Sequence, residues 1–272
     1  MRTHIKIFLC FLLAFGFSNC ETVVDIDLPT ADPKLVIEAN LDFNLKAFNP
    51  LQMIRLTTTT DYYSPQIPKV HGAEVWVTNN AGKTFHFTEK DQTGEYYCDY
   101  FSAELNDSYT LHINYKNELY EATEKLIEVP EIIYTEQKIT TIISEDLYQI
   151  TSYFQDNPDQ DNYYMVRYEL EGEKNSYSVF DDKFSQGNQM NTAYFSSDIK
   201  VGDELYIRLY GISKSYYNYM NTLLGIIGGG GGPFEVPVGQ VRGNVQNITD
   251  QKNYPLGYFR ITQYDTTSHI VN

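Results

Sequence analysis

The densest group of possible metal ligands is DNPDQDN, residues 156–162, which contains Asp156, Asp159 and Asp161. Carboxylate oxygens at this density suit Ca²⁺, but the spacing and the glycine of an EF-hand loop are absent. A solvated hairpin loop is the stronger interpretation, and these aspartates are weak calcium candidates. The histidines are isolated and form no close metal-binding spacing, so we otherwise predict no metal site.

Five consecutive glycines, residues 228–232, suggest a phosphate-binding loop. Such a loop needs a strand, then glycines, then Lys and Ser or Thr at the start of a helix. Here the glycines follow an apolar run, and no lysine occurs between Lys214 and Lys252. At the end of a helix the carbonyl groups are free, not the N–H groups that bind anions. We therefore expect a flexible loop and no cofactor.

Two short motifs come close to catalytic signatures. GISKS, residues 211–215, lacks the last glycine of the nucleophile elbow G-x-S-x-G. SDIK, residues 197–200, matches S-x-x-K but has no S-D-N or K-T-G partner. The 36 acidic residues offer too many possible pairs to single out a glycosidase-like pair of carboxylates. We predict no catalytic residue, and therefore a protein that is not an enzyme.

The N-terminus, MRTHIKIFLCFLLAFGFSNC, has the layout of a secretory signal peptide, residues 1–19. Its apolar run is too short for a membrane-spanning helix, which needs about 20 residues. Cys20 follows directly and is typical of the lipid acceptor of a bacterial lipoprotein. The alternative is ordinary cleavage near Asn19, which would leave a free thiol. Residues 20–33 then form a short, lipid-anchored tether.

Charge and cysteine content limit what the protein can bind and how its fold is stabilised. The net charge is -16, which rules out nucleic-acid binding through a general basic surface. Cys10 leaves with the signal and Cys20 carries lipid, so Cys98 has no partner for a disulfide. Cys98 alternates with tyrosines in a strand-like run, which favours a small buried hydrophobe over a nucleophile. The fold must therefore be stabilised by buried apolar surface.

Short segments with period-two hydrophobicity follow the tether. LVIEANL, AEVWVTN, KTFHFTE and SYTLHINY each place apolar residues on one face, and turn residues separate them. Such short, evenly spaced strands predict an antiparallel, Ig-like β-sandwich over residues 34–130. His86 and His112 lie opposite the apolar faces of their strands, so we expect them on the exposed side of the sheet.

The alternation resumes beyond Pro130 and predicts a second β domain over residues 131–272. NYYMVRYELE and ELYIRLYG are the clearest strands, and GYFRITQY is another. The composition agrees, because 24 Tyr and 15 Phe favour strands. The fold class is thus mostly β, with two antiparallel β-sandwich-like domains and one amphipathic helix in the second.

That helix is expected over residues 214–227, just before the glycines. Its apolar residues recur at i, i+3, i+4, i+7, i+8 and i+11 and end at Ile227, which predicts a stripe that packs onto the second sheet. Ser213 can cap the start of the helix. Gly228 can end it in a left-handed conformation. Tyr217 and Asn218 lie on the other face.

Several stretches together resemble one family. The export signal ending in Cys, PKLVIEANL, GAEVWVTN, NYYMVRYEL, VFDDKFSQGN, GISKSYYNYMNTL and GGPFEVP are similar to the domain of unknown function 4249 family of Bacteroidota. The resemblance implies an outer-membrane lipoprotein, often encoded beside TonB-dependent (SusC-like) receptors, and it implies no catalytic residues. Display on the periplasmic or on the cell-surface face stays open.

We therefore expect a non-enzymatic lipoprotein that assists a TonB-dependent outer-membrane transporter as an accessory or ligand-capture partner. The helix and the loop after it supply candidate partner contacts, namely Tyr217, Asn218 and Phe234. A surface glycan-binding module or hydrolase with tyrosine platforms is the alternative, and a structural envelope protein is a third possibility. The ligand, the identity of the partner and the oligomeric state are left open.

Overall fold

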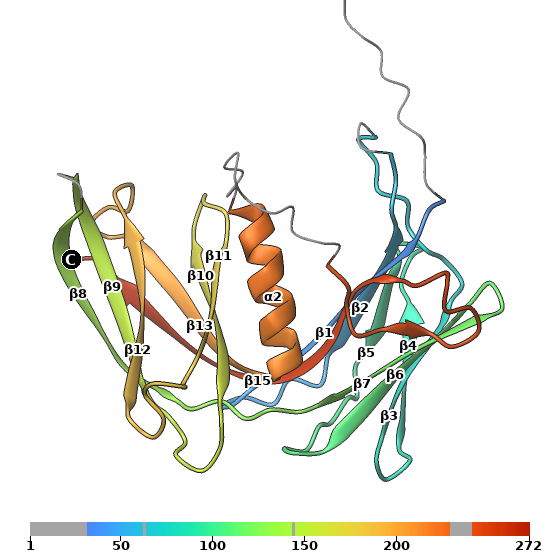
Figure 1. Cartoon of the computed structure of the whole chain (residues 1–272). Coiled ribbons are helices and arrows are strands. Elements are labelled where there is room, and N and C mark those ends of the chain that lie inside the picture. The colour runs from blue at the N-terminus through green and yellow to red at the C-terminus, as the bar shows by residue number, and fades with distance from the viewer. Residues whose placement is uncertain (1–31, 62–63, 143–144, 229–240) are drawn as a thin grey trace, which may run out of the picture. The chain divides into compact units, whose positions relative to one another are not determined.

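The computed structural model describes residues 32–61, 64–142, 145–228 and 241–272, in which two β-sheets and one helix are found (Figure 1). The helix, α2, spans Lys214–Ile227. The three-stranded sheet has the order β12 (Gln189–Ser196), β9 (Glu145–Gln155), β8 (Ile132–Ile142). The 12-stranded sheet has the order β11 (Ser176–Asp181), β10 (Tyr163–Leu170), β13 (Glu204–Ile212), β15 (Leu256–Ile270), β1 (Leu35–Asn44), β2 (Gln52–Thr58), β5 (Glu95–Cys98), β4 (Thr84–Glu89), β3 (Glu74–Asn79), β6 (Ser108–Tyr115), β7 (Glu118–Lys125), β14 (Gln246–Asn247).

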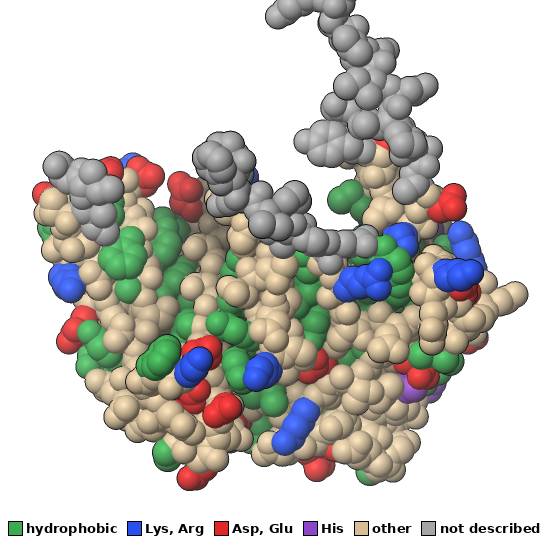
Figure 2. All heavy atoms as spheres, in the orientation of Figure 1, with side chains coloured by type: hydrophobic (Ala, Val, Ile, Leu, Met, Phe, Trp, Pro, Cys, Tyr) green, Lys and Arg blue, Asp and Glu red, His purple; other side chains and the backbone are tan. Residues whose placement is uncertain are grey.

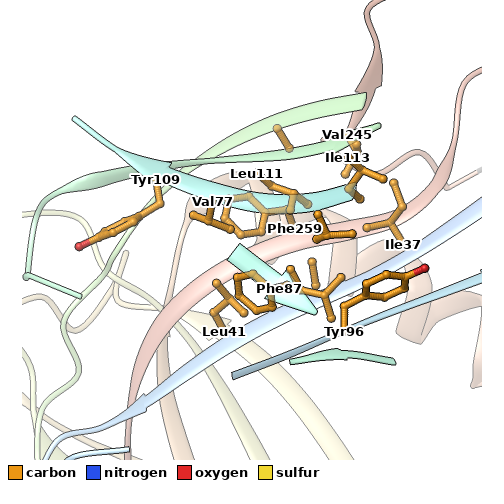
Figure 3. Close-up of a cluster of buried hydrophobic side chains, with 14 of the residues drawn as sticks. Ile37, Leu41, Val77, Phe87, Tyr96, Tyr109, Leu111, Ile113, Val245 and Phe259 are labelled. Atoms are coloured by element: carbon orange, nitrogen blue, oxygen red, sulfur yellow. The ribbon is translucent and has the colours of Figure 1, made fainter. Parts of the chain in front are cut away.

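The strands of the first half form two facing layers. Strands β1, β2 and β5 belong to one layer, β3, β6 and β7 to the other, and β4 bonds to both β3 and β5. The buried side chains between the layers, which we call the first core, include Ile37 of β1, Val77 of β3 and Leu111 of β6 (Figure 3). Apolar residues at every second position thus exclude water from between two sheets, as in a β-sandwich.

The three-stranded sheet packs on β10 and β13 of the larger sheet and encloses a second core. Its members occupy alternate positions on each strand and include Val166 and Tyr168 on β10, Ile207 and Leu209 on β13, and Ile150 on β9. The predicted alternation of these strands is confirmed. The prediction of a mostly β fold with sandwich-like halves and one amphipathic helix is confirmed as well. One pairing adds an exception to the antiparallel pattern, because β1 and β15 run parallel.

Helix α2 covers the opposite face of β10 and β13. Tyr216 and Met220 are buried there in a third cluster with Met165, Tyr210 and Tyr258. The predicted helix bounds are confirmed, and so is the cap, because the backbone N–H of Tyr216 donates to Ser213 Oγ at 3.2 Å.

Two details of the predicted helix are wrong, and both concern its C-terminal end. Ile227 is 70% exposed, because the apolar stripe runs past the last residues that the sheet can cover. Gly228 has φ −65° and ψ −1°, a right-handed conformation, and its N–H donates to Leu224 O at 2.8 Å. The helix therefore ends by continuing its own hydrogen-bond pattern for one residue, without a left-handed glycine.

Strand β15 bonds to β1 on one side and to β13 on the other, and Figure 1 shows it as the long strand between them. Its N-terminal part supplies Phe259 and Ile261 to the first core, and Val245 from the segment before it joins them. The predicted boundary near Pro130 stays a prediction, but the first core contains residues from beyond it. The predicted signal, the tether and Cys20 lie outside the described residues, apart from residues 32 and 33. Within the described ranges, no helix is long and apolar enough to cross a membrane.

Candidate functional site

A cleft of about 450 Å³ lies between α2 and the segment of residues 241–244 that precedes β15. We call it the α2 cleft. Hydroxyl, amide and guanidinium groups gather in it beside two tyrosine rings. Its lining residues are Ser215, Asn218, Tyr219, Thr222, Val241, Arg242, Gly243, Asn244 and Tyr258.

One wall of the cleft is a single face of α2. Ser215, Asn218, Tyr219 and Thr222 fall at i, i+3, i+4 and i+7, which places them on one side of a helix with 3.6 residues per turn. The buried stripe that begins at Tyr216 lies one residue further round. Packing of that stripe on the sheet therefore leaves the polar face of the helix open to the cleft.

The other wall is held against β15 by backbone geometry. A Cβ atom at Gly243 would lie 1.5 Å from the carbonyl oxygen of Gly257, so only glycine permits this approach. Asn244 follows, and its amide behaves like the backbone of a neighbouring strand. It donates to Phe259 O at 2.9 Å and accepts from Phe259 N at 2.9 Å. The segment is thereby fixed at one register beside the helix.

A buried carboxyl group, Glu124 of β7, connects the walls from behind. Its Oε1 accepts from Tyr258 Oη at 2.7 Å, from Ser215 Oγ at 3.2 Å and from the Asn244 amide at 3.2 Å. These donors come from β15, α2 and the segment 241–244. Burial raises the pKa of Glu124 above its ordinary value, against the lowering effect of these hydrogen bonds.

Arg242 contributes the one charged side chain among the lining residues. It is exposed, and its guanidinium carbon lies 4.3 Å from the ring centroid of Tyr254. Lys34 Nζ lies 3.4 Å from the same centroid. Within the described ranges Arg242 forms no ion pair. The cleft thus offers a cation and no exposed carboxylate, although the chain as a whole has a net charge of -16.

A larger hollow of about 690 Å³ lies over β1, β2 and β5. Its charged lining residues are Lys69 and the three paired residues Glu38, Arg55 and Glu95. Arg55 Nη2 donates to Glu95 Oε1 at 2.9 Å, and Nη1 lies 3.6 Å from Glu38 Oε2. The three residues stand opposite one another on neighbouring strands, as in a surface ladder of ion pairs. We therefore take the smaller α2 cleft as the candidate site.

The residues predicted from the sequence as partner contacts do not all line the α2 cleft. Asn218 is exposed and lines the cleft. Tyr217 lies outside the lining, half-buried, with its ring centroid 5.2 Å from that of Tyr163. Phe234 and residues 229–232 lie outside the described residues, as does Cys20.

The structure does not bring the three calcium candidates together. Asp156 is buried and accepts from Tyr164 Oη at 2.5 Å and from Gly187 N at 2.7 Å, whereas Asp159 and Asp161 are exposed. No three Asp, Glu, His or Cys side chains gather in a metal-binding group anywhere in the described ranges. The Asp156 carboxylate is thus used inside the fold, whereas the other two aspartates lie on the exposed loop.

Cys98, His112 and the motif GISKS, which were also singled out in the sequence, are all placed by the structure. Cys98 is buried in the first core, and burial raises the pKa of its thiol. His112 lies on the outer face of its sheet, stacked on Trp76 with ring centroids 5.1 Å apart and 2.8 Å from Glu121 Oε1. The motif GISKS supplies the helix cap Ser213 and the lining residue Ser215.

Sequence reasoning missed Glu124, although a signal was present. Tyr120, Ala122 and Glu124 occupy alternate positions of β7, and all three are buried. A carboxylate in phase with the apolar face of a strand must find polar partners, which points to a buried polar site. Nothing in the sequence pointed to Arg242 and Asn244, because the segment around them shows no regular alternation of apolar and polar residues.

Comparisons with solved structures give matches with low overall superposition. A two-domain fibronectin type III segment of chicken tenascin is 11% identical, covering 66% of this chain and 90% of its own, with a TM-score of 0.22. Three fibronectin domains of chicken CNTN1 are 11% identical, covering 67% and 62%, with a TM-score of 0.27. A DUF4785 family protein from Legionella pneumophila is 9% identical, covering 65% and 52%, with a TM-score of 0.23.

No curated protein matches the chain. A family model matches residues 21–268, which is most of the sequence, and its description assigns no activity. The chain therefore belongs to the family described as a domain of unknown function, DUF4249.

Proposed function

We propose that the protein is a non-enzymatic outer-membrane lipoprotein, anchored through Cys20, that captures a ligand for a TonB-dependent transporter or assists that transporter as an accessory. The α2 cleft is the observation that carries the proposal. It combines a volume suited to a small molecule with polar groups from two walls that are fixed by the fold.

The arrangement of Glu124 favours capture over catalysis. A general acid or base must come within hydrogen-bonding distance of the reacting group. Glu124 lies behind the lining residues, and its Oε1 is already bound to Tyr258, Ser215 and Asn244. Its carboxyl group therefore positions these side chains, while the lining itself offers donors and acceptors for binding.

The transporter partnership is tested by purifying the native chain from membranes. A tag follows Asn272, the membranes are solubilised in mild detergent, and copurifying proteins are identified by mass spectrometry. We expect a β-barrel transporter of the TonB-dependent class. Recovery without any β-barrel partner, from a preparation in which the chain itself is abundant, would contradict the proposal.

The anchor has its own control in the same preparation. Replacement Cys20→Ser removes the lipid acceptor, so this variant should leave the membrane fraction, because several acyl chains at about 0.8 kcal/mol per buried CH₂ hold a protein on a bilayer. Full retention of Cys20→Ser in washed membranes would exclude Cys20 as the anchor.

A surface glycan-binding module is the second candidate, favoured by the outer face of the three-stranded sheet. Tyr134 and Tyr153 stack there, with ring centroids 4.5 Å apart, and Tyr153 Oη donates to Glu136 at 3.1 Å. Tyr134 is 40% exposed. Flat aromatic pairs on an exposed sheet suit the apolar faces of sugar rings. Loss of polysaccharide binding in Tyr134→Ala, with binding kept in Asn218→Ala, would favour this candidate over the α2 cleft.

A further inference from the structure

We infer that the α2 cleft binds a sugar that carries one anionic group, either a carboxylate or a phosphate. The inference rests on the proposed capture function and names the class of ligand. It follows from the charge of the lining, from the side chains that still have hydrogen-bonding capacity, and from the size of the cleft.

The first argument is charge. Arg242 is the one charged lining residue, and its stacking on Tyr254 holds the guanidinium at the cleft. Arginine binds carboxylate and phosphate through two parallel hydrogen bonds. Figure 2 shows basic side chains gathered near the start of β1, on a surface where acidic side chains are widely spread. An anion is repelled by most of this chain and attracted here.

The second argument is hydrogen bonding. The Asn218 side-chain amide and the Arg242 guanidinium form no hydrogen bond to any residue in the described part of the chain, yet both line the cleft. Thr222 Oγ1 donates to the Asn218 carbonyl at 2.9 Å and keeps its lone pairs as acceptors. These groups can donate to and accept from hydroxyl groups of a ligand. The ring of half-buried Tyr219 supplies an apolar wall beside them.

The third argument is size and order. The volume of about 450 Å³ lies toward the small end of the range of about 300–1,000 Å³ for small-molecule sites. This favours a short saccharide over a polymer. Glu124 fixes Tyr258, Ser215 and Asn244 before any ligand arrives, so binding does not have to order that wall.

The test uses the full chain, purified in detergent, and three probes on the same sugar ring. D-galactose is neutral, D-galacturonate carries a carboxylate, and D-galactose 6-phosphate carries a phosphate. Isothermal titration up to low-millimolar concentration should show saturable binding of at least one anionic sugar and at least tenfold weaker binding of galactose. The two anionic arms show which group the cleft prefers.

Matched variants locate the binding. Arg242→Gln should weaken binding of the anionic sugar by about tenfold or more and leave galactose unchanged. Arg208→Gln is its control, because Arg208 also stacks on a tyrosine, Tyr264, outside the cleft. Asn218→Ala should weaken binding several-fold, whereas Asn221→Ala, the same change on the same helix outside the lining, should not.

Three results would overturn the inference. They are absence of saturable binding to either anionic sugar, equal affinity for galactose, and unchanged affinity in Arg242→Gln. Each is measured on the purified chain alone and leaves the transporter partnership untouched. Conversely, copurification without a transporter would remove the partnership and leave a measured ligand affinity in place.

Discussion

At the residue scale, buried charged groups determine where α2 rests on the sheet. Arg260 of β15 is 5% exposed, and its guanidinium carbon lies 5.0 Å from the ring centroids of both Tyr210 and Tyr216. Arg260 Nη2 donates to Asp42 at 2.5 Å, and Nη1 lies 3.4 Å from Tyr216 Oη. The helix thus packs on a cation that is paired with a carboxylate and lies against two aromatic rings, although its buried Nε has no hydrogen-bond partner among the described residues.

Replacement Arg260→Ala should therefore destabilise the protein strongly. It leaves a cavity under α2 and removes the partner of Asp42, and breaking a buried ion pair costs about 3–5 kcal/mol in free energy of unfolding. Because the Asp42 side chain is 25% exposed, we expect the lower end of that range. Urea denaturation measures it. Arg55→Ala is the control, since the Arg55 side chain is 45% exposed and surface pairs contribute about 0–1 kcal/mol. Equal effects of the two substitutions would contradict the prediction.

Glu124 makes stability depend on pH. Burial raises its pKa above the ordinary 4.5, so the folded protein binds this proton more tightly than the unfolded chain. The stability due to the neutral carboxyl is fully present below pH 4.5 and is lost as the pH rises through the raised pKa. Every tenfold difference in proton affinity corresponds to about 1.4 kcal/mol.

We therefore expect Glu124→Gln to gain stability relative to the natural chain as the pH rises from acidic to neutral, because the amide carries no charge to bury. Urea denaturation at a series of pH values measures the difference. Glu145→Gln, the same change at an exposed position of β9, is the control. A difference between Glu124→Gln and the natural chain that stays constant with pH would show that Glu124 has the same pKa in both states.

At the element scale, local patterns of sequence predicted more than long-range pairing. The bounds of α2 and its Ser213 cap follow from residues next to one another in the chain, and both were predicted. GYFRITQY was expected as one more strand of the second domain, whereas β15 continues to Ile270 and pairs in parallel with β1. No local period specifies a partner more than 200 residues away in the sequence.

The candidate site was only partly predictable for the same reason. Asn218 was chosen because helical spacing places it opposite the apolar stripe. Glu124, Arg242 and Asn244 come from segments far from α2 in the sequence, and they meet at the cleft only in the folded arrangement of β7, β15 and the helix. These groups are brought together by tertiary packing and not by their spacing along the sequence.

Helix α2 itself can be strengthened without touching the cleft. Gly225 lies inside the helix, is exposed, and an added Cβ atom would have no neighbour within 4 Å. Gly225→Ala should raise the free energy of unfolding by about 0.5–1 kcal/mol, because glycine loses more backbone entropy in a helix. Thermal and urea denaturation measure the gain. Gly243→Ala is the contrasting variant, since its Cβ atom would meet Gly257 O at 1.5 Å and displace a wall of the cleft. Destabilisation by Gly225→Ala would contradict the prediction.

At the scale of the whole molecule, β15 makes the two halves depend on one another. The same strand pairs with β1 next to the first core and with β13 next to the second. Arg260 is the fifth of the 15 residues of that strand and bonds to Asp42 of β1 while it supports α2. Packing in either half therefore fixes the position of the strand for the other half, and with it the distance between α2 and the segment 241–244.

This arrangement predicts that residues 34–130 will not fold as an independent domain. The isolated fragment lacks β15, so the backbone of β1 loses its parallel partner from Val36 to Asn44, and the first core loses Val245, Phe259 and Ile261. With β1 unpaired on one side and a gap in the core, the remaining contacts cannot offset the conformational entropy that the chain loses when it folds. The fragment should show a non-cooperative urea transition and poorly dispersed NMR signals, whereas residues 33–272 should unfold in a cooperative transition. Adding a separately produced peptide of residues 241–272 should restore dispersion, because it returns both the strand and the missing core. A cooperative transition of the fragment by itself, with the stability of the longer chain, would show that the first sandwich is complete without β15.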